Sequence, residues 1–133
     1  MKPRYRAWDV LAEKMIDEIL IISFVRKEII GKFSDGSTSV PLKFEDERNG
    51  EDVILMQSTD MVDRDGRIIF EGDIVKMSKD VYSEPTYYEV VRHRGGAYRL
   101  ESKQHGCELW LRHTDCEVVG NIYENPELLE ESK

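Results

Sequence analysis

Short stretches that fit an extended chain, separated by turn residues, run along the whole sequence. Residues 4–8 and 108–113 alternate apolar or aromatic with polar positions, and this period of two is typical of half-buried β-strands. Other stretches are short runs that contain β-branched and aromatic residues, which also favour strands. These runs are residues 15–24, 28–33, 53–57, 67–70, 74–77, 86–93, 97–101 and 116–123. The pattern predicts a mainly β fold with minor helix.

The segment after Asp9 fits two patterns. Asp9 would cap a helix that has Leu11, Met15, Ile19 and Ile22 on one face. The run from Ile19 to Ile22, however, is of a kind that prefers a sheet. We expect a loop or a single helical turn over residues 10–14, followed by a strand that begins at Met15.

The clearest turn signals lie in the centre of the chain. Asp65 and Gly66 form a dipeptide that tolerates positive φ, and the chain on both sides of it can be extended, which predicts a tight turn. Gly72 and Asp73 belong to a second turn that precedes another apolar run. Many small SH3-like barrels begin a strand in this way. We therefore expect a small SH3-like, barrel-type sheet in the C-terminal part, and we interpret these four residues as structural.

Glycine and proline mark two further features near the C-terminus. Gly95 and Gly96 separate two strand-like runs and predict a hairpin turn. Asn125 suits the N-cap of a helix and Pro126 suits its first position. We expect a short C-terminal helix there.

Residues 45–52 form the best candidate for a linker. They contain five carboxylates and one arginine, which cannot be buried together, and a turn signal at Asn49 and Gly50. The chain is expected to be a single domain over residues 1–133, with an N-terminal β lobe at 1–44 and a second lobe at 53–129.

Composition fits one soluble domain. The chain has 133 residues, 40% of them hydrophobic, which is enough for one ordinary core. Its net charge of −8 opposes general binding to a phosphate backbone. The sequence contains neither the run of about 20 apolar residues that crosses a bilayer nor the apolar core of a signal peptide. We expect a protein that stays in the cytoplasm of the cell that makes it and does not bind membranes.

Two stretches contain residue types that bind metal ions. One is acidic, and the other holds both cysteines. Asp63, Asp65 and Gly66 resemble half of an EF-hand loop, but the positions of the first and last ligands of such a loop do not hold carboxylates. Cys107 and Cys116, with His105 and His113, match no zinc spacing, and a strand would hold the two histidines too far apart. We expect no metal, no cofactor and two free cysteines.

The sequence also lacks a recognisable catalytic arrangement. No serine lies in a Gly-x-Ser-x-Gly elbow, and no glycine-rich phosphate-binding loop occurs. A cysteine nucleophile would need a nearby histidine as its base. We expect a protein that is not an enzyme.

Three ordered blocks span almost the whole chain. They are residues 6–9, then Thr59, Asp63, Gly66, Ile69 and residues 71–75, then residues 119–129. Together they resemble the YopX family of small proteins encoded by phages and prophages. The chain departs from the family pattern at Ser58, where an aromatic residue is usual, and at Asp60, where glycine is usual. The resemblance implies a phage or prophage protein that assembles as a homo-oligomer, and it brings no established biochemical activity.

A basic hairpin is the candidate for nucleic-acid contact. Basic and aromatic residues flank Gly95 and Gly96, and such side chains contact phosphates and stack on bases. The candidate binding residues are Arg92, Arg94, Tyr98 and Arg99, with His93, Lys103 and His105 nearby. Glutamates in the same strands offer the other interpretation, ordinary solvated ion pairs.

Self-association is the function that we favour. Numerous short strands leave sheet edges, which are blunted or pair with another copy of the chain. The acidic residues 45–52 offer a face for a host or phage protein. The prediction is a non-enzymatic phage or prophage accessory protein that acts by protein interaction as a homo-oligomer. The alternative is a nucleic-acid-binding module that uses the hairpin from Arg92 to Lys103.

Overall fold

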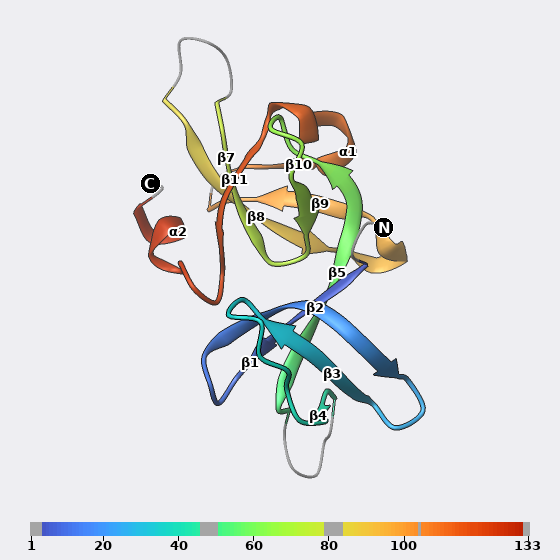
Figure 1. The fold of residues 1–133 in the computed structure, drawn as a ribbon. Coiled ribbons are helices and arrows are strands. Elements are labelled where there is room, and N and C mark those ends of the chain that lie inside the picture. The colour runs from blue at the N-terminus through green and yellow to red at the C-terminus, as the bar shows by residue number, and fades with distance from the viewer. Residues whose placement is uncertain (1–3, 46–50, 79–83, 104, 132–133) are drawn as a thin grey trace. The chain divides into compact units, whose positions relative to one another are not determined.

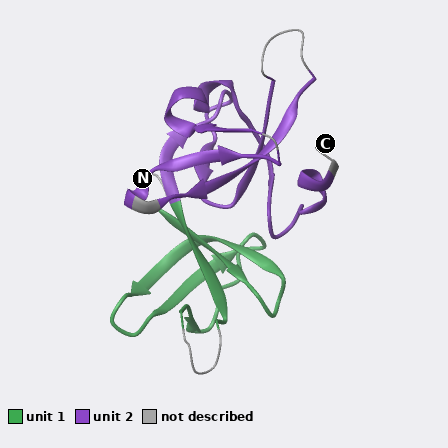
Figure 2. Cartoon of the chain, turned by 180° about the vertical axis from the view of Figure 1, so that it is seen from behind, with its two compact units in different colours: residues 1–57 green, residues 58–133 purple. Residues whose placement is uncertain are grey.

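The chain forms two compact units, residues 1–57 and residues 58–133 (Figure 2). The computed structural model describes residues 4–45, 51–78, 84–103 and 105–131. The mainly β prediction is confirmed, because strands dominate both units (Figure 1). Within the described ranges, none of the helices has the length and apolar character that a membrane span needs.

Unit 1 is an antiparallel sheet. Its strands are β1 (Tyr5–Asp9), β2 (Lys14–Ser23), β3 (Glu28–Phe33), β4 (Leu42–Lys43) and β5 (Val53–Val62). The strand order is β4-β3-β2-β1-β5-β6, so that β1 lies between β2 and the first half of β5. The second half of β5 belongs to unit 2 and pairs there with β6 (Ile68–Phe70). The core of unit 1 consists of Ala7, Ile16, Ile29, Phe44 and Val53.

Two irregularities in β2 explain why its sequence also fitted a helix. The pairing with β3 shifts between Ile16 and Glu18 and again between Ile19 and Ile21. Each shift places an extra residue in β2, as a β-bulge does, and changes which face the following side chains occupy. Ile19 and Ile22 consequently both pack against the core of unit 1. The spacing of three that suggested a helix is produced by a bulged strand.

Unit 2 contains an open five-stranded antiparallel sheet in the order β10-β9-β8-β7-β11. The strands are β7 (Asp73–Met77), β8 (Thr86–Arg92), β9 (Tyr98–Glu101), β10 (Gly106–Glu108) and β11 (Glu117–Asn121). Two short helices, α1 (Leu109–Arg112) and α2 (Glu127–Glu131), complete the unit. Its core gathers Ile69, Val75, Met77, Tyr88, Val90, Leu100, Leu109 and Cys116. The expected barrel is not closed, because no pairing joins β10 to β11 among the described residues.

The strand predicted at residues 108–113 is wrong. This stretch holds α1, followed by a 3-10 turn at His113–Asp115. The topology gives the reason, since β10 and β11 lie at opposite edges of the sheet and the chain must cross between them. The helical path buries Leu109 in the core and leaves Trp110 and Leu111 exposed. A straight continuation of β10 would not make this crossing.

The division between the units lies within β5, after Gln57. We expected lobes at 1–44 and 53–129, joined by the acidic residues 45–52. Of that segment, residues 46–50 lie outside the described ones. Asp52 lies in unit 1, where its backbone N–H donates to the carbonyl oxygen of Lys43 at 2.8 Å and its Oδ2 accepts from the Lys43 N–H at 2.9 Å. This part of the acidic segment is held against β4.

Candidate functional site

The central block of the sequence forms a polar network around Asp63. Asp63 follows β5 directly, and only 3% of its surface is exposed. Its Oδ1 accepts hydrogen bonds from the backbone N–H groups of Asp65 at 2.9 Å and Arg67 at 2.8 Å. Its Oδ2 accepts one from the N–H of Val118 in β11, at 2.9 Å. The carboxylate is therefore engaged by three backbone donors, which is the usual condition for burying a charge.

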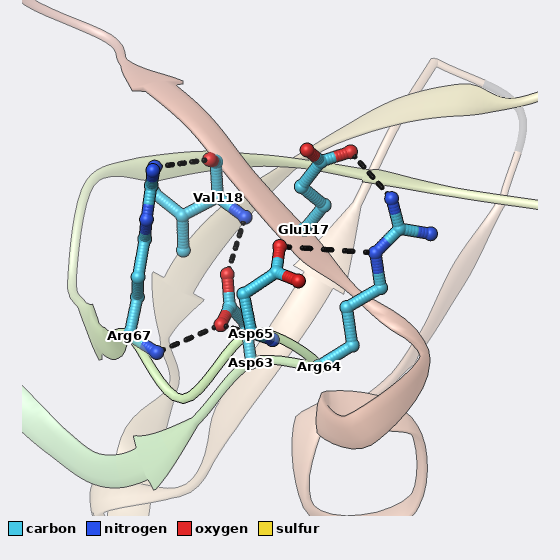
Figure 3. A network of polar contacts seen from close by, with 6 residues as sticks. All are labelled: Asp63, Arg64, Asp65, Arg67, Glu117 and Val118. Carbon is cyan, nitrogen blue, oxygen red and sulfur yellow. Dashed lines mark hydrogen bonds and ion pairs between the residues drawn. The ribbon is translucent and has the colours of Figure 1, made fainter.

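Two arginines beside this network reach β11 (Figure 3). The guanidinium of Arg64 contacts Glu117 at 2.8 Å and Asp65 at 3.9 Å. Arg67 donates from Nη1 to the carbonyl oxygen of Val118 at 3.4 Å. Both arginines are exposed, so each contact adds less than the buried Asp63 bonds do. The turn between β5 and β6 is thereby connected to a strand near the end of the chain.

The residues just before Asp63 organise a local bend in β5. Ser58 Oγ accepts from the N–H of Asp60 at 3.0 Å, and Thr59 Oγ1 donates to the carbonyl oxygen of Ile69 at 2.7 Å. Asp60 has φ of +62°, in the left-handed region that favours glycine. The pairing of β5 with β6 shifts register between Ser58 and Val62. Glycine, which the family resemblance would place at Asp60, suits this backbone.

The second turn has the same character. Asp73 is buried, and its Oδ2 accepts a hydrogen bond from the N–H of Phe70 at 2.8 Å. Gly72 has φ of +86°, its N–H donates to the carbonyl oxygen of Val90 and its own carbonyl accepts from Ile122, each at 2.9 Å. This turn holds the chain between β6 and β7 in contact with both β8 and the segment after β11.

The C-terminal block forms a third arrangement of this kind. Asn121 Oδ1 accepts from the backbone N–H groups of Tyr123 at 3.0 Å and Glu124 at 2.8 Å. The side chain of Asn125 points back rather than into the helix, since its Oδ1 accepts from the Asn121 N–H at 3.3 Å. A Cβ at Gly120 would lie 2.4 Å from that Oδ1, so glycine is required by space. The residues that carry the family resemblance thus serve the fold.

The basic hairpin is partly neutralised by its own glutamates. Arg99 pairs with Glu108 through Nη1 and approaches Glu101 with Nε at 3.8 Å. His93 Nε2 lies 2.7 Å from Glu101 Oε1. Arg92 is exposed at the end of β8. The arrangement leaves less unpaired positive charge than the sequence suggested.

The remaining candidate residues of the hairpin have different positions. Arg94 begins the 3-10 turn Arg94–Gly96, and its side chain lies outside the described part of the structure. Tyr98 is half-buried against the core of unit 2 rather than displayed for stacking. Lys103 and His105 are exposed beyond the end of β9. Among the described side chains, the candidate residues of the hairpin therefore differ in exposure and do not all face solvent.

Sequence reasoning missed an apolar surface on unit 1. The hairpin between β2 and β3 exposes four large apolar side chains, Leu20, Ile21, Phe24 and Val25, which we call the apolar tip. Val25 is 96% exposed, and Phe24 is 59% exposed although its ring touches those of Tyr5 and Phe44 with centroids 6.1 and 6.2 Å away. The sequence signal was Phe24 and Val25 at the position of a turn, where polar residues are usual.

The thiols lie within the core region of unit 2. Cys116 is buried, its Sγ lies 3.3 Å from the carbonyl oxygen of Arg112, and burial raises its pKa to about 12. Burial also raises the pKa of Cys107, which is half-buried. Both cysteines are free. Among the residues that the structure describes, no group of three or more His, Cys, Asp or Glu side chains is arranged to hold a metal ion.

Comparisons with known proteins agree with this fold. A family model described as YopX protein matches residues 4–130. The crystal structure of protein EF1440 from Enterococcus faecalis is similar with a TM-score of 0.64 and 28% identity, over 97% of this chain and 99% of that chain. The X-ray crystal structure of protein yopX from Bacillus subtilis has a TM-score of 0.65 and 26% identity over the same shares. A comparison with curated protein sequences gave no match.

Proposed function

Because the chain belongs to the YopX family, and because the residues of the family resemblance are engaged in turns, we propose that it acts through other surfaces, by protein interaction. The proposed role is that of a non-enzymatic phage or prophage accessory protein in the host-cell cytoplasm. It associates with further copies of itself, and a host or phage protein is a second class of partner.

The apolar tip is the observation that supports this proposal. Burying one large apolar side chain contributes about 1.5–3 kcal/mol, and four such side chains lie close together in the sequence of one hairpin. Val25, nearly fully exposed, gains the most from being covered. A hairpin that meets the same hairpin of a second copy covers both tips at once, which is the self-complementary contact of a two-fold dimer.

The experiment is a measurement of mass in solution. Native mass spectrometry and light scattering of the full chain should give a multiple of the chain mass at micromolar concentration. Val25→Asp places a charge at the tip and should weaken association at least tenfold. Val40→Asp is the matched control, because Val40 is also exposed in unit 1 but lies outside the tip. A monomeric wild-type protein, or equal effects of the two substitutions, would contradict the proposal.

Nucleic-acid binding through the hairpin from Arg92 to Lys103 is the alternative. It has less support, because Glu101 and Glu108 already pair with His93 and Arg99. Binding that weakens steeply with salt, and that is lost with Arg92→Ala, would favour this alternative. Association that is insensitive to salt would favour the apolar tip.

A further inference from the structure

Unit 2 contains a pocket of about 380 Å³, within the range of about 300–1,000 Å³ that is common for small-molecule sites. It arises from a mismatch in strand length. β9 pairs with β8 only from Glu89 to Arg92, so the first residues of β8 extend past the end of β9. On their other side these residues pair with β7, where Thr86 faces Met77. Cys107 in β10 and Arg112 in α1 also line the pocket.

Tyr88 lines this pocket with a side chain that carries a hydroxyl group. The residue as a whole is only 6% exposed. Burial raises the pKa of Tyr88, so the hydroxyl keeps its proton and can donate. Thr86, two residues earlier on the same face of β8, also lines the pocket.

Arg112 supplies a positive charge to the pocket, whose lining also includes the carboxylate residue Glu84 and His105. Its Nε donates to Asp115 Oδ2 at 2.9 Å, and its Nη2 donates to the carbonyl oxygen of Ser78 at 3.4 Å. A guanidinium has five N–H donors, so these two contacts orient the group and leave donors for a ligand. Met77 and the uncharged thiol of Cys107 provide an apolar floor.

We propose that this pocket binds a small organic carboxylate with an apolar body. The carboxylate accepts hydrogen bonds from Arg112 and from the Tyr88 hydroxyl, and the body lies against Met77 and Cys107. Arg112 provides a charge-assisted contact and Tyr88 a neutral one. This site is separate from the apolar tip, and the proposal does not depend on self-association.

Titration of the full chain with benzoate, followed by ¹H–¹⁵N NMR, tests this proposal. Saturable shifts are expected at the amides of Thr86, Tyr88 and Cys107. Arg112→Gln should weaken benzoate binding by about tenfold or more, the loss expected for a charge-assisted hydrogen bond. Tyr88→Phe removes only the hydroxyl and should weaken it by several-fold. Arg92→Gln changes the same charge at the far end of β8 and should leave binding unaltered.

Several outcomes would overturn the proposal. No saturable shift at millimolar benzoate would do so, as would equal binding of neutral benzyl alcohol, which has no carboxylate. Preferred binding of inorganic phosphate would show a different anion class. If Arg112→Gln disturbs the fold, the test rests on Tyr88→Phe alone. An unchanged affinity of that variant for benzoate would then contradict the proposed site.

Discussion

The carboxylate of Asp63 accepts a hydrogen bond from the backbone N–H of Val118, 55 positions further along the chain, at a distance of 2.9 Å. The same carboxylate satisfies two N–H groups of its own turn. A single side chain therefore fixes a local turn and joins it to a distant strand. Asp63 therefore stabilises both the turn between β5 and β6 and its attachment to β11.

Asp63→Ala should lower the free energy of unfolding by about 3 kcal/mol, because three backbone donors lose their acceptor at roughly 1 kcal/mol each. Urea unfolding followed by circular dichroism measures this loss. Asp65→Ala is the control, since the side chain of Asp65 is exposed and contacts Arg64 only at 3.9 Å. A similar loss of unfolding free energy in both variants would mean that the three buried hydrogen bonds of Asp63 contribute no more than the exposed side chain of Asp65.

Asp60→Gly should stabilise the protein by ~0.5 kcal/mol, because Asp60 has φ of +62° and glycine adopts this backbone without strain. Asp60→Val should destabilise it, because a β-branched residue tolerates positive φ poorly. Thermal unfolding of the two variants gives the comparison. Asp60→Ala separates the effect of backbone strain from the effect of the side chain, because it removes the carboxylate and keeps a Cβ. If alanine stabilises as much as glycine, strain is not the cause.

Gly120→Ala should destabilise the protein by about 1–3 kcal/mol, because the new Cβ would lie 2.4 Å from Asn125 Oδ1. A second substitution, Asn125→Gly, removes the clashing atoms. The double variant should lose less free energy of unfolding than the two single variants lose together. Chemical unfolding of the wild type, both single variants and the double variant completes this double-mutant cycle. Strictly additive losses would show that the contact is not the source of the effect.

Glu89→Gln should raise stability at pH 7 by ~0.5 kcal/mol, the size of a cross-strand pair effect. Burial, and then the charge of Glu101 on the facing strand, raise the pKa of Glu89. The folded protein therefore holds this proton more tightly than the unfolded chain does, and ionised Glu89 opposes folding. The unfavourable contribution of ionised Glu89 to folding is absent at acidic pH, and it grows as the pH rises through the raised pKa.

Unfolding free energies of wild type and Glu89→Gln, measured at about pH 3 and at pH 7, check the sign. The two proteins should be equally stable at the acidic end and should diverge at neutral pH. Glu18→Gln, at an exposed position of β2, is the control and should show no such divergence. An equal gain at both pH values would attribute the effect to packing.

Most strands could be predicted because their signals are local. The strand expected at residues 28–33 coincides with β3, and turn chemistry indicated the bends around Gly66 and Gly72. The prediction of a strand at residues 108–113 was wrong because the path of this stretch depends on where β11 lies in the sheet. No local sequence pattern contains that information. The openness of the sheet in unit 2 could not be read from local patterns for the same reason, since closure depends on the two edge strands meeting.

The candidate sites were less predictable than the strands. The basic hairpin was visible as composition, but its pairing with Glu108 depends on the return of the chain through β10. The pocket beside Tyr88 depends on the unequal lengths of β8 and β9. The apolar tip depends on the bulges of β2, which change the faces of its side chains. Each of these features is a relation between strands, and a single stretch of sequence does not record it.

The second bulge of β2 determines how many apolar side chains of this strand are exposed at the apolar tip. Because the second bulge makes Leu20 the extra residue opposite β3, Leu20 and Ile21 are both exposed while Ile19 and Ile22 contact the core. Deleting one residue there would restore strict alternation and remove one exposed apolar side chain. A change in length, with no other change in amino-acid type, is therefore sufficient to reduce the apolar tip, while Phe24 and Val25 stay exposed in the turn.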